Sequence, residues 1–201
     1  MEIVQVGATV LRQVGRHVDP AEVRTNEFQR LIESMRTTMK EAPGVGLAAP
    51  QIGRSLQLAV AEDPPEFIEQ QTPDQAALTE RDTLPFMVLI NPILEPVGDE
   101  TAEFFEGCLS VDGYRALVLR HRRVHLRWTD ATGAEHDREF AGWPARILQH
   151  EVDHLHGIVY TDRMLPRSLV TTKSWSERWA ELPIAEVHEA LRIDAVTPPG
   201  S

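Results

Sequence analysis

A histidine-containing segment, AGWPARILQHEVDHLHG at residues 141–157, restricts the fold of this chain more than any other stretch. It holds the pattern H-E-x-x-H, formed by His150, Glu151 and His154. On a helix, residues four apart lie on the same face, so both imidazoles can reach a single metal ion. Glu151 lies beside them, where it can handle the proton of a water held by that metal. The pattern therefore predicts a helix that carries a metal site.

The same segment is expected to be helical for a second reason. Its apolar residues recur at spacings of three and four: Ala145, Leu148, Val152 and Leu155. Gly157 is a natural end for such a helix. The histidines fall beside the apolar stripe, so a buried helix would direct them inward. Two histidines on a helix can also be satisfied polar groups, so the motif needs support from the rest of the chain.

Length and composition restrict the class of protein. A chain of 201 residues suits one globular domain, and a formal net charge of -11 argues against a surface built for nucleic acid. The single cysteine, Cys108, cannot form an intrachain disulfide. No apolar run approaches the length of a membrane span, and the first residues lack the pattern of a signal or transit peptide. We therefore expect a cytoplasmic protein without a membrane segment or nucleic-acid specificity.

Apolar periodicity predicts the elements of the N-terminal half. Residues 1–24 are expected to be extended or irregular, and residues 28–39 to form a helix with Thr25 or Asn26 as its cap. A strand is expected at 57–62. Residues 63–84 are polar and proline-rich, which indicates a surface excursion to which the sequence assigns no function.

The C-terminal half is expected to be richer in strands. One is predicted at 85–94, broken by Pro92, and a hairpin crosses a turn at residues 130–133. A short strand is expected within 157–165, and one or two helices within 167–201, before the tail TPPGS. The basic cluster Arg120, Arg122 and Arg123 indicates a solvated strand face or a docking site.

Two further stretches can supply chemistry. In GVGLAAPQIG, residues 44–53, the glycines let the backbone approach a ligand while Gln51 offers an amide; a purely structural turn is the alternative. Cys108 is expected in a turn that leads to a strand at 115–120, either as a small buried side chain or as a ligand or nucleophile. A catalytic metal site needs three protein ligands. Position 160 holds Tyr160 rather than a third histidine, and Glu177 lacks a supporting context, so the Cys108 thiolate is the better candidate.

Three motifs together resemble those of the peptide deformylase family: GVGLAAPQ at 44–51, EGCLS at 106–110 and QHEVDH at 149–154. The resemblance extends from the early V-L-R to about Met164. The run GWPARILQHEVDHLHG is most similar to the deformylase subtype of mitochondria, plants and some bacteria. The segment after residue 166 matches no subtype in an obvious way.

The resemblance implies an α+β fold, with antiparallel β-sheets packed around a central metal-binding helix, an N-terminal helix and a helical C-terminal segment. It implies a catalytic domain at 1–166 and an extension at 167–201 packed on the same domain. The implied activity is removal of the formyl group from the N-terminal formylmethionine of new polypeptides, with release of formate. Transient ribosome contact and a monomer or homodimer are further expectations.

The resemblance also implies roles for individual residues. The metal ligands would be Cys108, His150 and His154, with Glu151 as general base and later acid. Gln51 and the backbone N–H of Leu109 would bind the developing oxyanion. The backbone of the substrate would pair with Gly44, Val45, Gly46 and Gly107, and the methionine pocket would be lined by Glu106, Trp143, Arg146 and Ile147. The implied native metal is Fe²⁺, with Zn²⁺, Ni²⁺ or Co²⁺ as substitutes in isolated protein.

Two other functions fit parts of the pattern. A zinc endopeptidase of the H-E-x-x-H type would cleave internal peptide bonds and would not need Cys108. A non-catalytic binder of formylated peptides or of the ribosome surface would keep its binding after Glu151→Ala.

Overall fold

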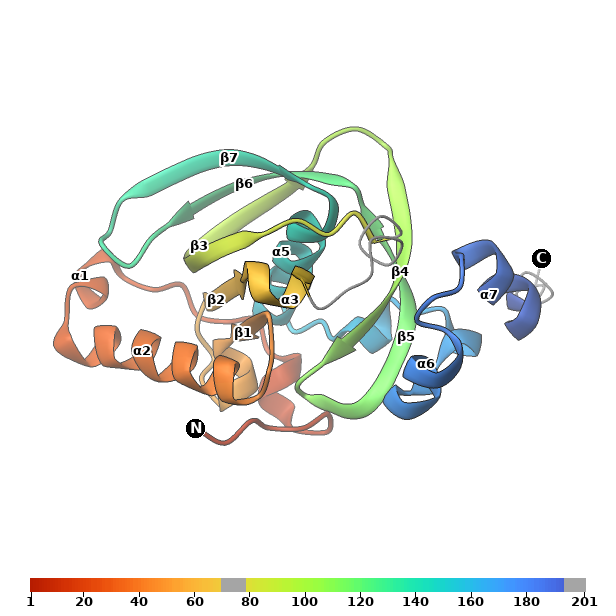
Figure 1. Cartoon of the computed structure of the whole chain (residues 1–201). Coiled ribbons are helices and arrows are strands. Elements are labelled where there is room, and N and C mark those ends of the chain that lie inside the picture. The colour runs from red at the N-terminus through yellow and green to blue at the C-terminus, as the bar shows by residue number, and fades with distance from the viewer. Residues whose placement is uncertain (70–78, 194–201) are drawn as a thin grey trace, which may run out of the picture.

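Two antiparallel β-sheets and one buried helix form the centre of the molecule in the computed structural model, which describes residues 1–69 and 79–193 (Figure 1). The predicted α+β class, with sheets around a central helix, is confirmed. Within the described residues, no helix is both long and apolar enough to cross a membrane.

The larger sheet has the strand order β1-β2-β3-β6-β7, and all neighbouring strands are antiparallel. Its strands are β1 (Gly46–Ala48), β2 (Leu58–Asp63), β3 (Leu84–Pro96), β6 (Arg123–Thr129) and β7 (Glu135–Ala141). The strand predicted at 57–62 is confirmed as β2, and the predicted hairpin is the β6–β7 pair.

The predicted break of the third strand at Pro92 is wrong. β3 continues through this proline because its pairing with β6 shifts register between Ile90 and Ile93. Asn91 has a positive φ of 50° at the irregularity. Proline has no N–H for a partner strand, and a bulge is a place where a sheet tolerates that loss.

The smaller sheet has the order β4-β5-β8, with β4 (Thr101–Cys108), β5 (Val111–His121) and β8 (Val170–Thr171). Cys108 is therefore not in a turn, as predicted, but is the last residue of β4. Residues from Thr101 to Gly107 pair with β5, and the register shifts between Gly107 and Cys108. A glycine beside a bulge has the local sequence of a turn, which explains the wrong prediction.

The N-terminal helix is α2 (Asn26–Glu41), as predicted. The Thr25 hydroxyl accepts a hydrogen bond from the Phe28 N–H at 3.2 Å and caps it. Residues 1–24 are mostly irregular but include the short helices η1 (Thr9–Arg12) and α1 (Pro20–Val23). After β1 comes η2 (Ala49–Ile52).

The central helix is α5 (Gly142–Leu155), and it lies against the larger sheet (Figure 1). Leu148, Val152 and Leu155 on this helix pack with Ala59 of β2 and Leu89 of β3. This burial holds the opposite side of the helix towards the smaller sheet, where Cys108 ends β4. The fold thus brings Cys108 of β4 close to the two histidines of α5, as the predicted metal site requires.

The predicted strand within 157–165 is wrong. The chain forms η3 (Tyr160–Asp162) instead, because the Asp162 carboxylate accepts a hydrogen bond from the Val159 N–H at 2.9 Å and closes a turn. Only an isolated bridge between Val118 and Met164 remains of the expected pairing in this described region.

The C-terminal segment is helical, as predicted, with η4 (Pro166–Ser168), α6 (Thr172–Arg178) and α7 (Ile184–Leu191). Both longer helices lie beside β4 and β5 (Figure 1), where their apolar residues cluster with Phe105 and Leu117. The domain boundary at 166 stays a prediction. The tail TPPGS lies outside the described residues, as do residues 70–78 of the excursion, which begins with α3 (Pro65–Glu69).

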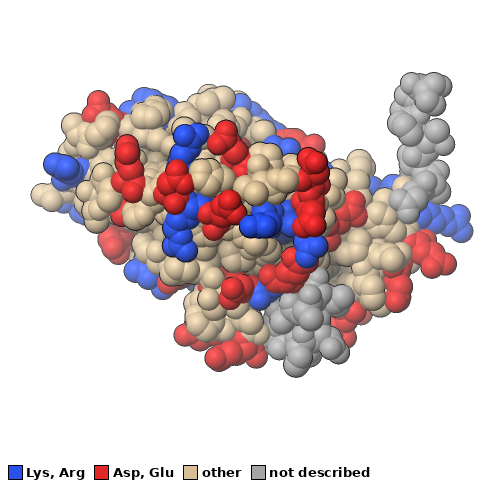
Figure 2. Space-filling view, turned by 90° about the horizontal axis from the view of Figure 1, so that it is seen from above, with Lys and Arg blue, Asp and Glu red and all other residues tan. Residues whose placement is uncertain are grey.

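The basic cluster predicted from the sequence divides between surface and interior. Arg122 pairs with Glu80, and Arg123 pairs with Glu139 at 3.0 Å, so both belong to a solvated face. Figure 2 shows basic and acidic side chains interspersed on the face above β6 and β7. Arg120 is different, because only 5% of it is exposed. Its role belongs to the site.

Candidate metal centre

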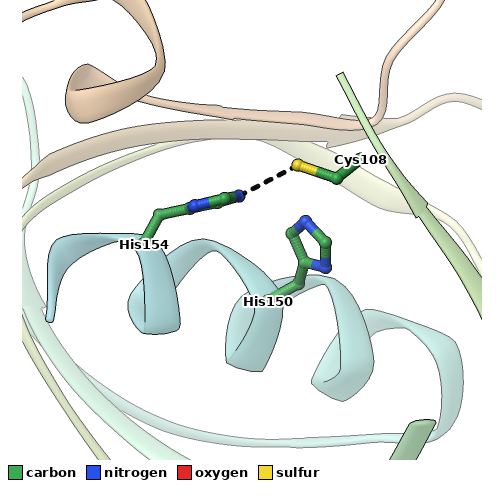
Figure 3. Close-up of side chains that lie close together, drawn as sticks. All are labelled: Cys108, His150 and His154. Carbon is green, nitrogen blue, oxygen red and sulfur yellow. Dashed lines mark hydrogen bonds between the residues drawn. The ribbon is translucent and has the colours of Figure 1, made fainter. Parts of the chain in front are cut away.

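Three potential metal ligands converge from two elements, as Figure 3 shows. Cys108 comes from the end of β4, while His150 and His154 lie one turn apart on α5. Their donor atoms all lie within 4.8 Å of one another, and Cys108 Sγ is 3.2 Å from His154 Nε2. A thiolate with two imidazoles is a donor set that suits Zn²⁺ and Fe²⁺. The residues therefore fit a single divalent ion.

The two histidines have opposite electrostatic surroundings. Burial lowers the pKa of His154 well below its ordinary value, so this imidazole is neutral and keeps a free lone pair. Burial also lowers the pKa of His150, but hydrogen bonds to Cys108 and Glu106 outweigh it and raise the pKa well above the ordinary value. The negative groups around His150 thus attract positive charge, whether a proton or a metal.

Glu106 fixes the orientation of His150. The Glu106 Oε2 atom lies 3.0 Å from His150 Nδ1. Burial raises the pKa of Glu106, but the charge and hydrogen bonds of Arg120 outweigh burial and hold the pKa far below its ordinary value. The ionised carboxylate accepts a hydrogen bond from the Nδ1–H group. A metal would displace the second proton of His150, and this hydrogen bond would then keep the remaining proton on Nδ1 and leave Nε2 to the metal.

Arg120 forms a bridge between the Glu106 carboxylate and Asp153 of α5. Its Nε and Nη2 atoms lie 2.8 and 2.9 Å from the Glu106 oxygens, and its Nη1 atom lies 2.6 Å from Asp153 Oδ2. Sequence reasoning missed Arg120 and Asp153. In the structure, Arg120 shares a buried face of β5 with Ala116 and Val118, but no signal in the sequence indicated this because Leu117 and Leu119 make the other face equally apolar.

Glu151 lies against the backbone of β1. A Cβ atom added to Gly46 would lie 2.1 Å from Glu151 Oε1, so only glycine fits beside this carboxylate. The other oxygen, Oε2, is buried and has no hydrogen-bond partner among the described residues. Burial raises the pKa of Glu151 to about 7, and a bound cation would lower it again. The site thus contains a buried carboxylate with one free oxygen.

Gln51 points its amide nitrogen at the thiolate. Its Nε2 atom lies 3.4 Å from Cys108 Sγ and 3.3 Å from Ser110 Oγ. Its Oε1 atom accepts a hydrogen bond from the Ala48 N–H at 2.8 Å, which fixes the direction of the amide. The side chain is 1% exposed, so a donor faces the site from a rigid position.

A cavity of about 900 Å³ opens onto these groups. All of the predicted site residues except His154 line it: Gly44, Val45, Gly46, Gln51, Glu106, Gly107, Cys108, Leu109, Trp143, Arg146, Ile147, His150 and Glu151. His154 lies deeper and is 1% exposed. Arg146 lines the cavity while its Nη1 atom donates to Glu106 at 2.6 Å. The size suits a ligand as large as a short peptide.

The excursion reaches this cavity, which the sequence did not predict. Phe67 of α3 and Arg81 both line it. Arg81 is held by two hydrogen bonds to Asp63, of 2.8 and 2.7 Å, and its guanidinium lies 5.8 Å from the centre of the Trp143 ring. Glu177, the weaker candidate for a third ligand, lies on α6, within 3.9 Å of Lys173.

Comparisons with known proteins place the chain in a family. A family model described as polypeptide deformylase matches residues 1–169. The chain is 47% identical over 182 residues to peptide deformylase 1 of Streptomyces coelicolor, covering 90% of this chain and 81% of that protein. It is 44% identical over 185 residues to the chloroplastic/mitochondrial peptide deformylase 1A of Arabidopsis thaliana, covering 92% and 67%. A Met-Ala-Ser-bound class I type b peptide deformylase of Acinetobacter baumannii superimposes with a TM-score of 0.71 at 31% identity, covering 81% and 96%.

Proposed function

Because this chain belongs to the polypeptide deformylase family, we propose that it removes the N-formyl group from the N-terminal formylmethionine of newly synthesised polypeptides and releases formate. The observation that carries the proposal is the convergence of Cys108, His150 and His154 beside a buried carboxylate with a free oxygen. Neither alternative function is favoured. An endopeptidase of the H-E-x-x-H type has no need of the thiolate, and a binder has no need of Glu151.

The metal site of the proposal is formed by Cys108, His150 and His154. When bound, a divalent ion at these residues lowers the pKa of water and polarises a carbonyl oxygen. We propose Fe²⁺ as the native ion, with Zn²⁺, Ni²⁺ or Co²⁺ in protein isolated under other conditions, because the donor set accepts all of them. Metal analysis after anaerobic purification tests this: zinc with full activity retained in air would contradict native iron.

Glu151 moves the proton in the proposed reaction. It accepts a proton from the attacking water and passes it to the leaving nitrogen as the amide bond breaks. Its Oε2 atom has no competing hydrogen bond in the described residues, and β1 passes its Oε1 atom so closely that the carboxylate has little freedom. The close packing against β1 thus fixes the position of the same carboxylate that would transfer the proton.

The side-chain amide of Gln51 and the backbone N–H of Leu109 stabilise the negative charge that develops on the formyl oxygen. The Gln51 amide is pre-oriented by the Ala48 N–H, and Leu109 follows Cys108 directly at the cavity wall. One donor of this kind typically contributes about 3 kcal/mol to the transition state. Gln51, Gly46 and Glu151 crowd this end of the cavity, so we expect a formyl group to fit and an acetyl group to be refused.

Substrate recognition would use the remaining cavity wall. Val45, Trp143 and Ile147 offer apolar surface for the methionine side chain, and all three pack in one hydrophobic cluster. The backbone around Gly44, Gly46 and Gly107 would pair with an extended peptide, as an added strand does. Glu106 and Arg146 line the same pocket, but their mutual hydrogen bond makes them supports for the wall.

We infer a cytoplasmic location, where new formylated chains appear in bacteria; the bacterial relatives support it, although one plant relative is named chloroplastic/mitochondrial. The partners are formylmethionyl peptides, and the Met-Ala-Ser complex of the Acinetobacter protein supports peptide binding. Transient ribosome contact and a monomer or homodimer stay predictions.

Formate release from a formyl-Met peptide, beside its acetyl-Met analogue, tests the proposal. We expect formate from the first peptide and no acetate from the second. Glu151→Gln, which keeps the shape of the side chain, should reduce turnover to a small residual rate while bound metal, measured on the same sample, is retained. Cleavage of internal peptide bonds, or formyl-peptide binding without turnover in the metal-loaded wild type, would overturn it.

A further inference from the structure

The chain beyond the family match builds part of the cavity wall. The match ends at residue 169, and β8 then pairs with β5 at Tyr114 and Arg115. Thr172, the first residue of α6, lines the cavity. The Thr171 hydroxyl accepts a hydrogen bond from the Ser174 N–H at 3.1 Å and caps the helix. The N-terminal end of α6 therefore lies at the edge of the cavity.

Trp175, in the first turn of α6, holds a cavity-lining arginine. The guanidinium carbon of Arg115 lies 4.2 Å from the centre of the Trp175 ring, within the range of a cation–π contact. Trp175 is itself anchored in the apolar cluster that fastens the extension to Phe105 and Leu117 of the smaller sheet. The position of Arg115 thus depends on a residue beyond the part of the chain that the family model matches.

Arg115 lies beside the metal ligands. It pairs across the sheet with Gly107, the residue before Cys108. A Cβ atom at Gly107 would lie 3.4 Å from Arg115 Cγ and 3.5 Å from Arg115 Cζ, so the arginine side chain extends across this glycine. A peptide that pairs with the backbone at Gly107 would pass within reach of the guanidinium.

Within the described residues, Arg115 differs from the other cavity arginines in its lack of a carboxylate. Arg81 is paired with Asp63, and Arg146 with Glu106. The Arg115 Nε atom is buried without a hydrogen-bond partner. Burial lowers the pKa of Arg115, yet a guanidinium stays protonated at neutral pH. A partly desolvated positive charge without a carboxylate partner favours an anionic ligand.

We propose that Arg115, positioned by Trp175, binds a carboxylate of the peptide substrate downstream of the formylmethionine, so that α6 takes part in substrate selection. This inference rests on the proposed deformylase function. Arg115 would contact the substrate, and Trp175 is a positioning residue that acts through it.

Paired peptide amides that differ only by Glu in place of Gln test the proposal. The pairs are formyl-Met-Glu-Ala with formyl-Met-Gln-Ala, and formyl-Met-Ala-Glu with formyl-Met-Ala-Gln. In the metal-loaded wild type, we expect kcat/KM for Glu to exceed that for Gln by about threefold to tenfold at one position or both. The difference should lie in KM and should shrink with added salt.

Three variants assign the preference to the contact. Trp175→Leu and Arg115→Met should each bring the Glu-to-Gln ratio close to one, while Trp175→Phe, which keeps an aromatic face, should retain most of it. Trp179→Leu is the matched control, because Trp179 lies in the same apolar cluster but makes no ring contact with Arg115. The ratio is taken within each variant, so a general loss of activity or stability cancels.

Two results would overturn the inference. One is equal release of formate from Glu and Gln peptides at both positions in the wild type. The other is a wild-type preference that persists in Trp175→Leu or Arg115→Met. Failure of the proposed function is distinct, because it would give no formate from any of the four peptides.

Discussion

Gly46→Ala should disable the proposed base without removing it. The added Cβ atom would lie 2.1 Å from Glu151 Oε1, 2.5 Å from Cδ and 2.8 Å from Cγ. A methyl carbon forms no hydrogen bond and stays over about 3 Å from its non-bonded neighbours, so the carboxylate must retreat by about 1 Å. A misplacement of about 1 Å can lower a rate about 100-fold, which corresponds to about 2.7 kcal/mol. We therefore expect kcat to fall by about two orders of magnitude.

The assay is steady-state formate release from a formyl-Met peptide, with metal content measured on the same preparation. Glu151→Gln and the double variant complete a mutant cycle. If Gly46 acts through Glu151, alanine at 46 should cost little in the Glu151→Gln background. Activity within about threefold of wild type would refute the reasoning, as would a further 100-fold loss in the double variant.

Three other predictions concern stability and the metal. Arg120→Leu should lower the free energy of unfolding by about 3 to 5 kcal/mol, because it removes this partner from the buried carboxylates of Glu106 and Asp153. Arg123→Leu changes an exposed arginine and is the control. Equal urea midpoints for the two variants would contradict the prediction. Although burial raises the pKa of Asp130, hydrogen bonds from its turn and from His136 hold it below the ordinary value. This stabilisation is present above the ordinary carboxyl pKa near 4 and is lost as pH falls through the lowered folded value. The free energy of unfolding of Asp130→Asn should therefore be lower than that of the wild type at pH 7, and the difference between the two should narrow below about pH 4. A difference that does not depend on pH would count against this origin. Cys108→Ser should lower the bound metal at least about tenfold by elemental analysis, and stoichiometric metal would show that the thiolate is not a ligand.

Much of the fold and site could be predicted because the signals are local. The helical spacing of His150 and His154 needs only one turn of chain, and the caps of α2 and the turn of the β6–β7 hairpin are equally local. The predicted cavity-lining residues came from the family resemblance of a few short stretches, whereas Phe67, Arg81 and Thr172 line the cavity without having been predicted. Chain segments of this kind carry their own conformational preferences.

The wrong predictions have several causes, and only some of them are contacts between distant segments. Cys108 is in a strand because β5 pairs with it, although Gly107 gives the segment the look of a turn. Tyr160 sits in an apolar run typical of a strand, but Asp162 closes a turn there. The contact of Trp175 with Arg115 joins an extension to a motif strand, and no periodicity in either segment indicates it.

Arg120 shows a different kind of failure, since its charge pointed to the surface and its buried partners lie far away in the sequence. Its neighbours Arg122 and Arg123 suggest a solvated cluster, but in the structure Arg120 shares a buried face of β5 with Ala116 and Val118. Charge favoured the surface, and strand periodicity could not decide because Leu117 and Leu119 make the other face equally apolar. The buried Glu106 and Asp153 carboxylates, which come from other segments, explain why Arg120 lies in the interior.

X-ray absorption at the edge of the bound metal tests the central claim most directly. For protein loaded with one zinc ion, the account predicts one sulfur neighbour at about 2.3 Å and two imidazole nitrogens at about 2.0 to 2.1 Å. The sulfur signal should vanish in Cys108→Ser. A wild-type spectrum with only oxygen and nitrogen neighbours would contradict a site built from Cys108, His150 and His154.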